Sequence, residues 1–129
     1  EGRPSLLFDG AHNAHGARAL RDYLDEFVKV PVTLLFGAMR DKDLKEIAAT
    51  LFPAARNLIL TQPSNPRAAT PETLAAIVPA NFDRSRLALI SSPAEALDEA
   101  YRLTPPRALI CVTGSLYLVG EILSIPQSS

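Results

Sequence analysis

The sequence predicts an α/β fold, a Rossmann-like three-layer domain with a mainly parallel sheet of five to six strands and helices on both faces. Two observations predict this class. Short apolar runs alternate along the chain with longer segments of helical periodicity, which is typical of parallel strands joined by crossover helices. The chain is 129 residues long, which suits one domain with a single core, so 1–129 is treated as one domain.

The first third of the chain predicts two strands with one helix between them. The first strand is expected at 5–8, and Pro31 precedes a second strand at 32–36, which Gly37 ends. Between them, apolar residues recur at the i, i+4, i+7 and i+8 spacing of one helix face. The residues of this expected core stripe are Leu20, Leu24, Phe27 and Val28.

The middle of the chain predicts two helices and a strand at 57–61. Asp43 is a favourable N-cap, with Glu46 three residues on as its capping-box partner. Prolines make 62–69 an irregular loop, after which Thr70 caps a helix that has proline at its first position. The residues expected to face the core from these helices are Leu44, Ile47, Ala48, Leu51, Leu74, Ile77 and Val78.

The last third predicts two strands and two helices. The strands are expected at 86–90 and 108–112. A capping box at 92–95 opens one helix, which continues to about Arg102, and the turn 113–115 leads into the other. The residues expected to face inward from these helices are Ala94, Leu97, Tyr101, Leu116, Val119, Gly120 and Leu123.

Composition and charge exclude several classes of function. The net charge of −1 provides no basic field for nucleic acid, and no apolar run approaches the ~20 residues that span a bilayer. The one cysteine, Cys111, lies in an apolar strand and is expected to be a buried thiol. This is compatible with a reducing compartment, so a cytoplasmic protein is expected. The chain begins at Glu1 without a Met, which indicates a piece of a longer protein.

Polar residues gather in four of the turns that follow predicted strands, at 9–13, 37–42, 62–67 and 113–115. In an open α/β sheet, ligands bind just beyond the carboxyl ends of the strands, where such turns lie. We therefore expect the four turns to share one edge of the sheet and to form a ligand site. The alternative is that the turns are polar only because loops face water and helices need caps.

Two residues of the first turn are candidates for ligand binding. The Asp9 carboxylate can accept hydrogen bonds from the ribose hydroxyls of a nucleotide, or it can cap the helix that follows. His12 can donate to a phosphate or to a substrate carboxylate, whereas His15 is expected on the helix surface. The two histidines lack the further ligands that a metal site needs, so no metal site is expected in this domain.

Three cations and one hydroxyl are candidates in the other turns. Arg40 and Lys42 either meet a phosphate or carboxylate, or form a self-neutralised surface cluster with the two aspartates beside them. Arg67 follows a rigid Asn-Pro pair and is well placed to hold a carboxylate in bidentate fashion. Ser115 lies at a helix start, where it either takes part in binding an anion or caps the helix.

The sequence has no Gly-rich loop of the form GxxxxGK(S/T). The backbone N–H groups of such a loop cradle the phosphates of a nucleoside triphosphate. If a nucleotide of this kind is a substrate, another domain must hold most of its phosphates.

Four motifs occur in order along the chain: Asp9-Gly10-Ala11-His12-Asn13, Arg40-Asp41-Lys42-Asp43, Asn65-Pro66-Arg67-Ala68 and Gly114-Ser115-Leu116-Tyr117-Leu118-Val119-Gly120-Glu121. With these motifs, and over nearly its whole length, the chain resembles the C-terminal domain of the Mur ligase superfamily. It is most similar to folylpolyglutamate synthase/dihydrofolate synthase. One departure is Ala14, where that family usually has proline. This loosens the turn but removes no polar group.

The resemblance implies an ATP-dependent amide-forming ligase that adds L-glutamate to dihydropteroate or a folate through an acyl phosphate. It implies that 1–129 is the C-terminal (glutamate ligase) domain. An N-terminal ATPase domain then holds ATP, Mg²⁺ and most of the pterin site, and the C-terminal domain completes this site on closing. The fragment alone is expected to be inactive, and the whole enzyme is expected to be a monomer.

The resemblance also implies roles for residues of the first turn. ATP is expected to contact Asp9, His12 and Asn13, with Asp9 at the nucleoside. His12 is expected to lie by the phosphates or by the incoming glutamate, which makes it a catalytic candidate.

In the other turns, Arg40, Lys42, Arg67 and Ser115 are the candidates for substrate binding. Arg67 and Ser115 are expected to orient glutamate or the acyl phosphate, and they are catalytic candidates beside His12. Two alternatives remain. One is a peptidoglycan precursor ligase of the same superfamily, which adds an amino acid to a UDP-linked peptide. The other is a Rossmann-like binding module without catalysis. The Gly in the first motif and the start of the last motif favour the folate branch.

Overall fold

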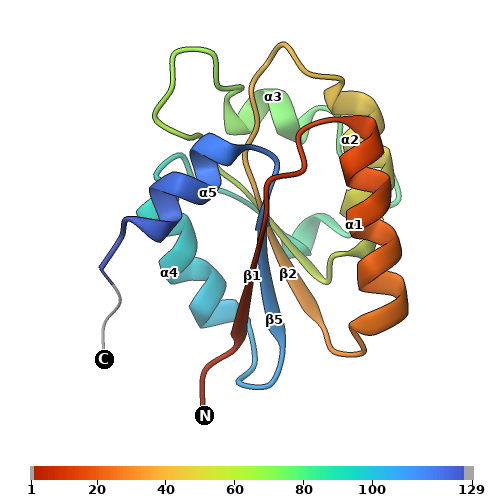
Figure 1. The fold of residues 1–129 in the computed structure, drawn as a ribbon, viewed down its shortest axis with the longest axis vertical. Helices are drawn as coiled ribbons and strands as arrows, with labels where there is room; N and C mark the ends of the chain where they lie inside the picture. Colours follow the sequence, from red (N-terminus) through yellow and green to blue (C-terminus); the bar gives the residue numbers. More distant parts are fainter. Residues whose placement is uncertain (1, 127–129) are drawn as a thin grey trace.

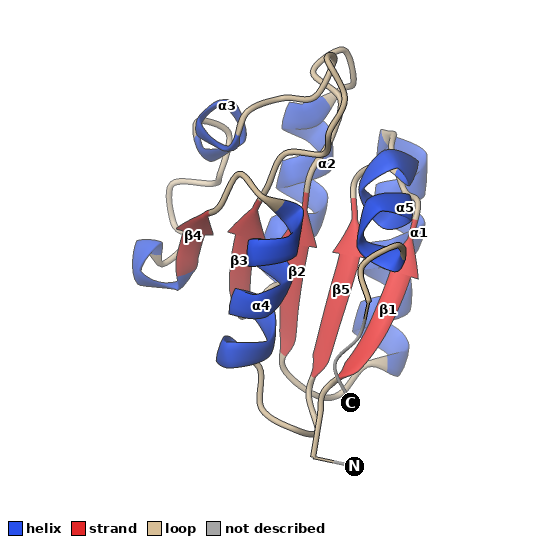
Figure 2. Cartoon of the chain, turned by 90° about the vertical axis from the view of Figure 1, so that its left-hand side faces the viewer, coloured by secondary structure: helices blue, strands red, loops and turns tan. Residues whose placement is uncertain are grey.

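A computed structural model describes residues 2–126 of the chain. These residues form one five-stranded sheet in the order β1-β5-β2-β3-β4, and every neighbouring pair of strands is parallel. Helices lie in front of the sheet and behind it (Figure 2), so the predicted three-layer α/β class is confirmed. The strands are β1 (Ser5–Asp9), β2 (Val32–Phe36), β3 (Asn57–Leu60), β4 (Leu87–Leu89) and β5 (Leu109–Thr113). The helices are α1 (Ala14–Phe27), α2 (Leu44–Leu51), α3 (Pro71–Ala75), α4 (Pro93–Leu103) and α5 (Leu116–Leu123), with short 3-10 turns at Phe52–Ala54 and Arg84–Arg86.

Alternate residues of the buried strands face two separate cores. On β2, Leu34 and Phe36 belong to the core under α1, α2 and α3, whereas Leu35 faces the core under α4 and α5. Figure 1 shows α1 and α2 on one side of the sheet and α4 and α5 on the other. All residues of β2 and β5 are buried, as expected for the central strands of a parallel sheet covered on both faces.

The strand order places β5 between β1 and β2. The chain leaves β2 through α2 on one face of the sheet, and it leaves β5 through α5 on the opposite face. The carboxyl ends of β2 and β5 therefore flank a topological switch point, where open α/β sheets form their ligand crevices. This topology predicts a crevice between these two strand ends.

Most predicted strand boundaries agree with the structure to within one residue. β1 extends to Asp9 and β5 to Thr113, each one residue farther than predicted, while β3 ends at Leu60, one residue earlier. The predicted strand at 86–90 is shortened to β4, because Arg86 belongs to a 3-10 turn. Differences of this size are usual at the ends of elements.

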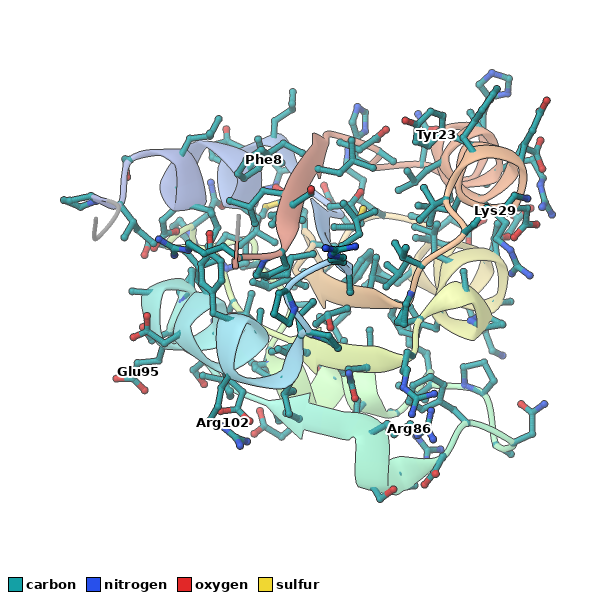
Figure 3. The ribbon with its side chains drawn as sticks, turned by 90° about the horizontal axis from the view of Figure 1, so that it is seen from below. Phe8, Tyr23, Lys29, Arg86, Glu95 and Arg102 are labelled. Atoms are coloured by element: carbon teal, nitrogen blue, oxygen red, sulfur yellow. The ribbon has the colours of Figure 1, made fainter. Side chains whose placement is uncertain are left out.

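The predicted core position at Phe27 is wrong. Its side chain is 64% exposed and packs against Tyr23 on the helix surface, with ring centroids 5.3 Å apart. Tyr23 lies on α1 (Figure 3) and is itself 46% exposed. The next residue, Val28, packs against the core instead, because the backbone turns to an extended conformation at this C-cap position.

The predicted inner face of α5 is wrong except at Val119, which is half-buried against the core under α4 and α5. Leu118 and Ile122 are buried, whereas Leu116 and Leu123 are 66% and 61% exposed, and Gly120 is exposed too. Nearly every residue of α5 is apolar, so the spacing of apolar residues does not distinguish the buried face. The packing of the helix against β5 and α4 decides it.

The predicted inner face of α4 is partly correct. Leu97 is buried, and Tyr101 is half-buried against the same core. Ala94 is exposed, so its predicted inward position is wrong. Ala96 and Ala100 are fully buried instead, one turn apart, and their small side chains let the helix backbone approach the sheet closely.

Two of the predicted helix caps form and one does not. Thr70 and Ser92 each accept a hydrogen bond from the backbone N–H three residues on, over 3.1 and 3.3 Å. Asp43 makes no side-chain cap hydrogen bond, so this prediction is wrong. Its carboxyl group interacts with Glu46 instead, and it raises the pKa of Glu46 through a side-chain hydrogen bond and charge repulsion.

Cys111 lies fully buried in β5. Burial, and to a lesser extent the charge of Asp9, raises the pKa of its thiol to about 12. The thiol therefore stays protonated at neutral pH, where a reactive cysteine would be ionised. The prediction of a buried thiol rather than a nucleophile is confirmed.

Candidate functional site

A cavity lies at the switch point between β2 and β5, at the carboxyl edge of the sheet. Its volume is about 180 Å³. It is lined by His12, Met39, Lys42, Arg67, Gly114, Ser115, Leu116 and Tyr117. All four polar turns contribute to this lining, so the structure brings together the predicted site residues His12, Lys42, Arg67 and Ser115.

Strand pairing explains why the four turns meet. Thr113, the last residue of β5, is paired with Asp9 on one side and with Phe36 on the other. Phe36 in turn is paired with Leu60 of β3. Four strands therefore end at the same level, and the turns that follow them start side by side, at the upper end of the sheet in Figure 1.

The turn after β5 is shaped by Gly114 and Ser115. Gly114 has a φ of +110°, and a Cβ atom there would lie 2.5 Å from the carbonyl oxygen of Gly37, so only glycine fits without strain. Ser115 is buried, and its Oγ accepts a hydrogen bond from the backbone N–H of Tyr117 over 2.9 Å. Ser115 is thus the N-cap of α5, and its hydroxyl still has one O–H donor at the cavity wall.

The polar residues of the turn after β1 fall into two groups. Asp9 and Asn13 hydrogen-bond to the backbone, and His12 lines the cavity. Asp9 Oδ1 accepts from the backbone N–H of Ala11 over 2.8 Å, and Asn13 Oδ1 caps α1 by accepting from the backbone N–H of Gly16 over 2.7 Å. Of this turn, only His12 lines the cavity. Asp9 keeps its second carboxylate oxygen, and Asn13 keeps its NH₂ group, for other partners.

Arg40 links the turn after β2 to the loop after β3 through hydrogen bonds. Its backbone N–H donates to the carbonyl of Arg67 over 2.7 Å, and its guanidinium donates to the carbonyl of Pro66 over 2.6 Å. Next to it, Met39 forms an antiparallel bridge with Ala68. The turn after β2 and the loop after β3 therefore form one unit, and Arg40 lies outside the cavity lining.

The cavity lining contains two cations and no carboxylate. Within residues 2–126, the Lys42 ammonium has no hydrogen-bond or ion-pair partner, and Arg67 Nη2 contacts Asp41 Oδ2 at 2.5 Å. The Arg67 hydrogen bond holds the pKa of Asp41 below its usual value, so this pair is charged at neutral pH. Within the described range neither Arg40 nor Lys42 forms an ion pair with the aspartates beside it, although the charge of Lys42 contributes to lowering the pKa of Asp41. The cavity is expected to attract carboxylates or phosphates.

Sequence reasoning missed the apolar part of the cavity. Met39 is buried, whereas Leu116 and Tyr117 are 66% and 56% exposed. Leu116, predicted in the core, lies over the first turn instead: a Cβ atom on Gly10 would come within 2.5 Å of its Cδ2 atom. The signal that could have found these residues is their position directly after the strand ends of the switch point.

The first turn offers a free acceptor oxygen at this edge of the domain. The second carboxylate oxygen of Asp9 is an acceptor of the kind that binds ribose hydroxyls. Within residues 2–126, no group of three or more His, Cys, Asp or Glu side chains lies close enough to hold a metal ion. No helix in the described part of the chain has the length and apolar character needed to cross a membrane.

Known proteins share this sequence pattern. The family model described as "Mur ligase, glutamate ligase domain" matches residues 1–116, which include all four polar turns. A probable bifunctional folylpolyglutamate synthase/dihydropteroate synthase of Haloferax volcanii is 32% identical over 121 residues, which make up 92% of this chain and 14% of that protein. The folylpolyglutamate synthase of Lacticaseibacillus casei is 31% identical over 120 residues, 92% of this chain and 26% of that protein.

A solved structure has the same fold. The Mycobacterium tuberculosis folylpolyglutamate synthase complexed with ADP matches with a TM-score of 0.85 and 27% sequence identity, over 95% of this chain and 30% of that one. The present chain therefore spans less than a third of the length of each of these three proteins.

Proposed function

Because this chain belongs to the glutamate ligase domain family of the Mur ligases, we propose that 1–129 is the C-terminal domain of an ATP-dependent ligase that adds L-glutamate to dihydropteroate or a folate. The observation that carries the proposal is the cavity in which Lys42 and Arg67 lie beside His12 and Ser115. The folylpolyglutamate synthases among the relatives support folates as the substrate class.

The proposal divides the work between two domains. The sequence has no Gly-rich phosphate loop, so an N-terminal ATPase domain is proposed to hold the ATP phosphates, Mg²⁺ and most of the pterin. ATP supplies the phosphoryl group that activates the substrate carboxylate as an acyl phosphate. The residues of the present domain then position the glutamate, whose amino group attacks the acyl carbon and displaces inorganic phosphate. Reactions of this kind depend mainly on orientation and electrostatics.

Each cavity residue has a role that its chemistry supports. Arg67 and Lys42 are proposed to hold the carboxylates of glutamate, with Arg67 offering the planar fork that suits this group. His12 and Ser115 are proposed to donate hydrogen bonds to the acyl phosphate or to the negative oxygen that develops during attack. Arg40 contributes through the loop that carries Arg67.

The nucleotide is proposed to lie at the turn after β1. The free carboxylate oxygen of Asp9 accepts from the ribose, and Asn13 adds its NH₂ group while it caps α1. These two residues lie outside the cavity lining, which keeps the nucleoside and the incoming amino acid in adjacent but separate places.

The test uses steady-state kinetics of the full-length enzyme. Arg67→Ala is expected to raise the KM for glutamate by about tenfold or more, because a charge-assisted hydrogen bond is lost, and to leave the KM for ATP unchanged. Asp9→Ala is expected to raise the KM for ATP instead. The control is Arg102→Ala, which removes a distant arginine on the outer side of α4 (Figure 3). An Arg67 variant with wild-type glutamate kinetics would contradict the proposed site.

A second measurement identifies the acceptor. We expect glutamate-dependent ATP hydrolysis with a reduced pteroate and none with a UDP-muramoyl peptide precursor. The opposite pattern would assign the enzyme to the peptidoglycan branch of the superfamily. If neither acceptor supports ATP hydrolysis, the result would favour the alternative that this protein is a binding module without catalysis.

A further inference from the structure

We propose that Asp41 is a positioning residue for Arg67, and that it thereby sets how tightly the carboxylate of the incoming amino acid is bound. The inference rests on the function proposed above. Asp41 is outside the cavity lining, whereas Arg67 is part of it. The side chain of Asp41 contacts the Arg67 guanidinium, and its proposed influence on a bound carboxylate passes through this contact.

The backbone holds Asp41 beside Arg67. Arg40, the residue before Asp41, donates to the loop of Arg67 from its backbone N–H and from its guanidinium, over 2.7 and 2.6 Å. The bridge between Met39 and Ala68 adds a further connection between the same two segments. Because both backbones are fixed, the two side chains meet as a result of the fold and not of a chance surface encounter.

The contact uses only part of the Arg67 guanidinium. Nη2 donates to Asp41 Oδ2 over 2.5 Å, and the side chain makes no other hydrogen bond within residues 2–126. A guanidinium carries five N–H donors in a rigid fork, so the remaining donors are available to a second carboxylate. Arg67 thus reaches the cavity with its side chain already oriented.

Orientation before binding strengthens binding. A flexible arginine loses rotamer freedom when a ligand fixes it, and a partner that fixes it beforehand removes this loss from the binding step. Both side chains are about half exposed, 53% for Arg67 and 52% for Asp41, so the pair contributes little to the stability of the fold. The opposite hypothesis is that Asp41 competes with the substrate carboxylate for Arg67. The two hypotheses predict opposite changes in KM.

The test again uses the full-length enzyme. Asp41→Asn keeps the size of the side chain and removes its charge, and we expect a rise in the KM for glutamate of about three- to tenfold. The kcat and the KM for ATP are expected to stay at wild-type values. Asp41→Glu keeps the carboxylate and is expected to recover most of the lost affinity. The matched control is Asp43→Asn, which removes the same charge two residues away, from a carboxylate whose partner is Glu46. It is expected to leave the glutamate KM unchanged.

A double-mutant cycle tests the route of the effect. In an Arg67→Ala background, Asp41→Asn is expected to change nothing further, because Asp41 acts through the missing guanidinium. An unchanged or lowered glutamate KM for Asp41→Asn alone overturns the positioning role, as does a full additional loss in the Arg67→Ala background. A wild-type enzyme without glutamate-dependent turnover refutes the proposed function itself, and this inference with it.

Discussion

Gly114 is the residue on which the shape of the cavity depends most directly. It turns the chain from β5 into α5 with a φ of +110°, in a place where the Gly37 carbonyl leaves no room for a side chain. Gly120, six residues on, lies in α5 with no atom within 4 Å of the position that its Cβ would take. The same residue type is therefore required at one position and unfavourable at the other.

This contrast makes a prediction about stability. Gly114→Ala is expected to lower the free energy of unfolding by at least about 2 kcal/mol, because it combines backbone strain with a steric clash. Gly120→Ala is expected to raise it by about 0.5–1 kcal/mol, since alanine favours a helix. Urea unfolding of both variants measures the two changes. Equal changes in the free energy of unfolding for the two variants would show that the turn after β5 does not require a left-handed conformation.

Several polar residues at or near the cavity can support the fold and bind a ligand at the same time. Asn13 and Ser115 cap helices through their acceptor oxygens, yet their N–H and O–H donors remain available. Arg67 is held by one carboxylate and can bind another. For these residues, support of the fold and binding of a ligand are not exclusive alternatives, because each function uses different atoms of the same side chain.

At the scale of elements, the apolar residues of α5 lie in two different environments, the core and the cavity wall. Its inner side packs on the sheet through Leu118 and Ile122, while Leu116 and Tyr117 in its first turn line the cavity. Leu116 and Leu118 are two residues apart, and so lie on different sides of the helix. The outer side of the first turn therefore lines the cavity, whereas Leu118 and Ile122 on the inner side of the helix belong to the core.

The two leucines predict opposite outcomes for the same substitution. Leu118→Ala is expected to lower the free energy of unfolding by about 2–5 kcal/mol, because it empties a fully buried position. Leu116→Ala is expected to change it by less than about 0.5 kcal/mol, since this side chain is mostly exposed. Denaturant titration measures both values. A large loss of unfolding free energy for Leu116→Ala would indicate that Leu116 faces the core, as the sequence predicted.

At the scale of the whole molecule, charge is distributed unevenly. The chain has a net charge of −1, yet the cavity at the carboxyl edge is lined by Lys42 and Arg67 without an acid. This separation arises from the topology, because strand order brings turns from distant parts of the sequence to the same edge. A cavity lined by two cations thus forms on a protein that has no overall basic field.

The isolated domain tests this division between fold and activity. With one sheet and two cores that share it, 1–129 is expected to unfold cooperatively, as single domains of this size usually do. It is expected to show no glutamate-dependent ATP hydrolysis, because it lacks a phosphate loop. Circular dichroism during urea unfolding and a phosphate-release assay measure these properties. Turnover by the isolated domain would contradict the proposed need for an N-terminal ATPase domain.

The sequence by itself determined the fold class, the order of the elements and the four turns of the site. These features follow from local patterns: apolar runs predict buried strands, and polar turns follow the strand ends. The same patterns placed Thr70 and Ser92 correctly as caps. They failed at Asp43, where the neighbouring Glu46 interacts with the carboxyl group that was expected to cap the helix.

Only the tertiary structure decided which side of α5 is buried, which of Phe27 and Val28 faces the core, and which cations line the cavity. Each of these depends on what a side chain meets across the fold. An almost wholly apolar helix does not encode its own buried face. The sequence also does not show that Asp41 pairs with Arg67 rather than with its neighbours, because these residues meet only when β2 and β3 lie side by side. Local patterns specify elements, whereas the contacts between elements select the atoms that remain free to bind a ligand.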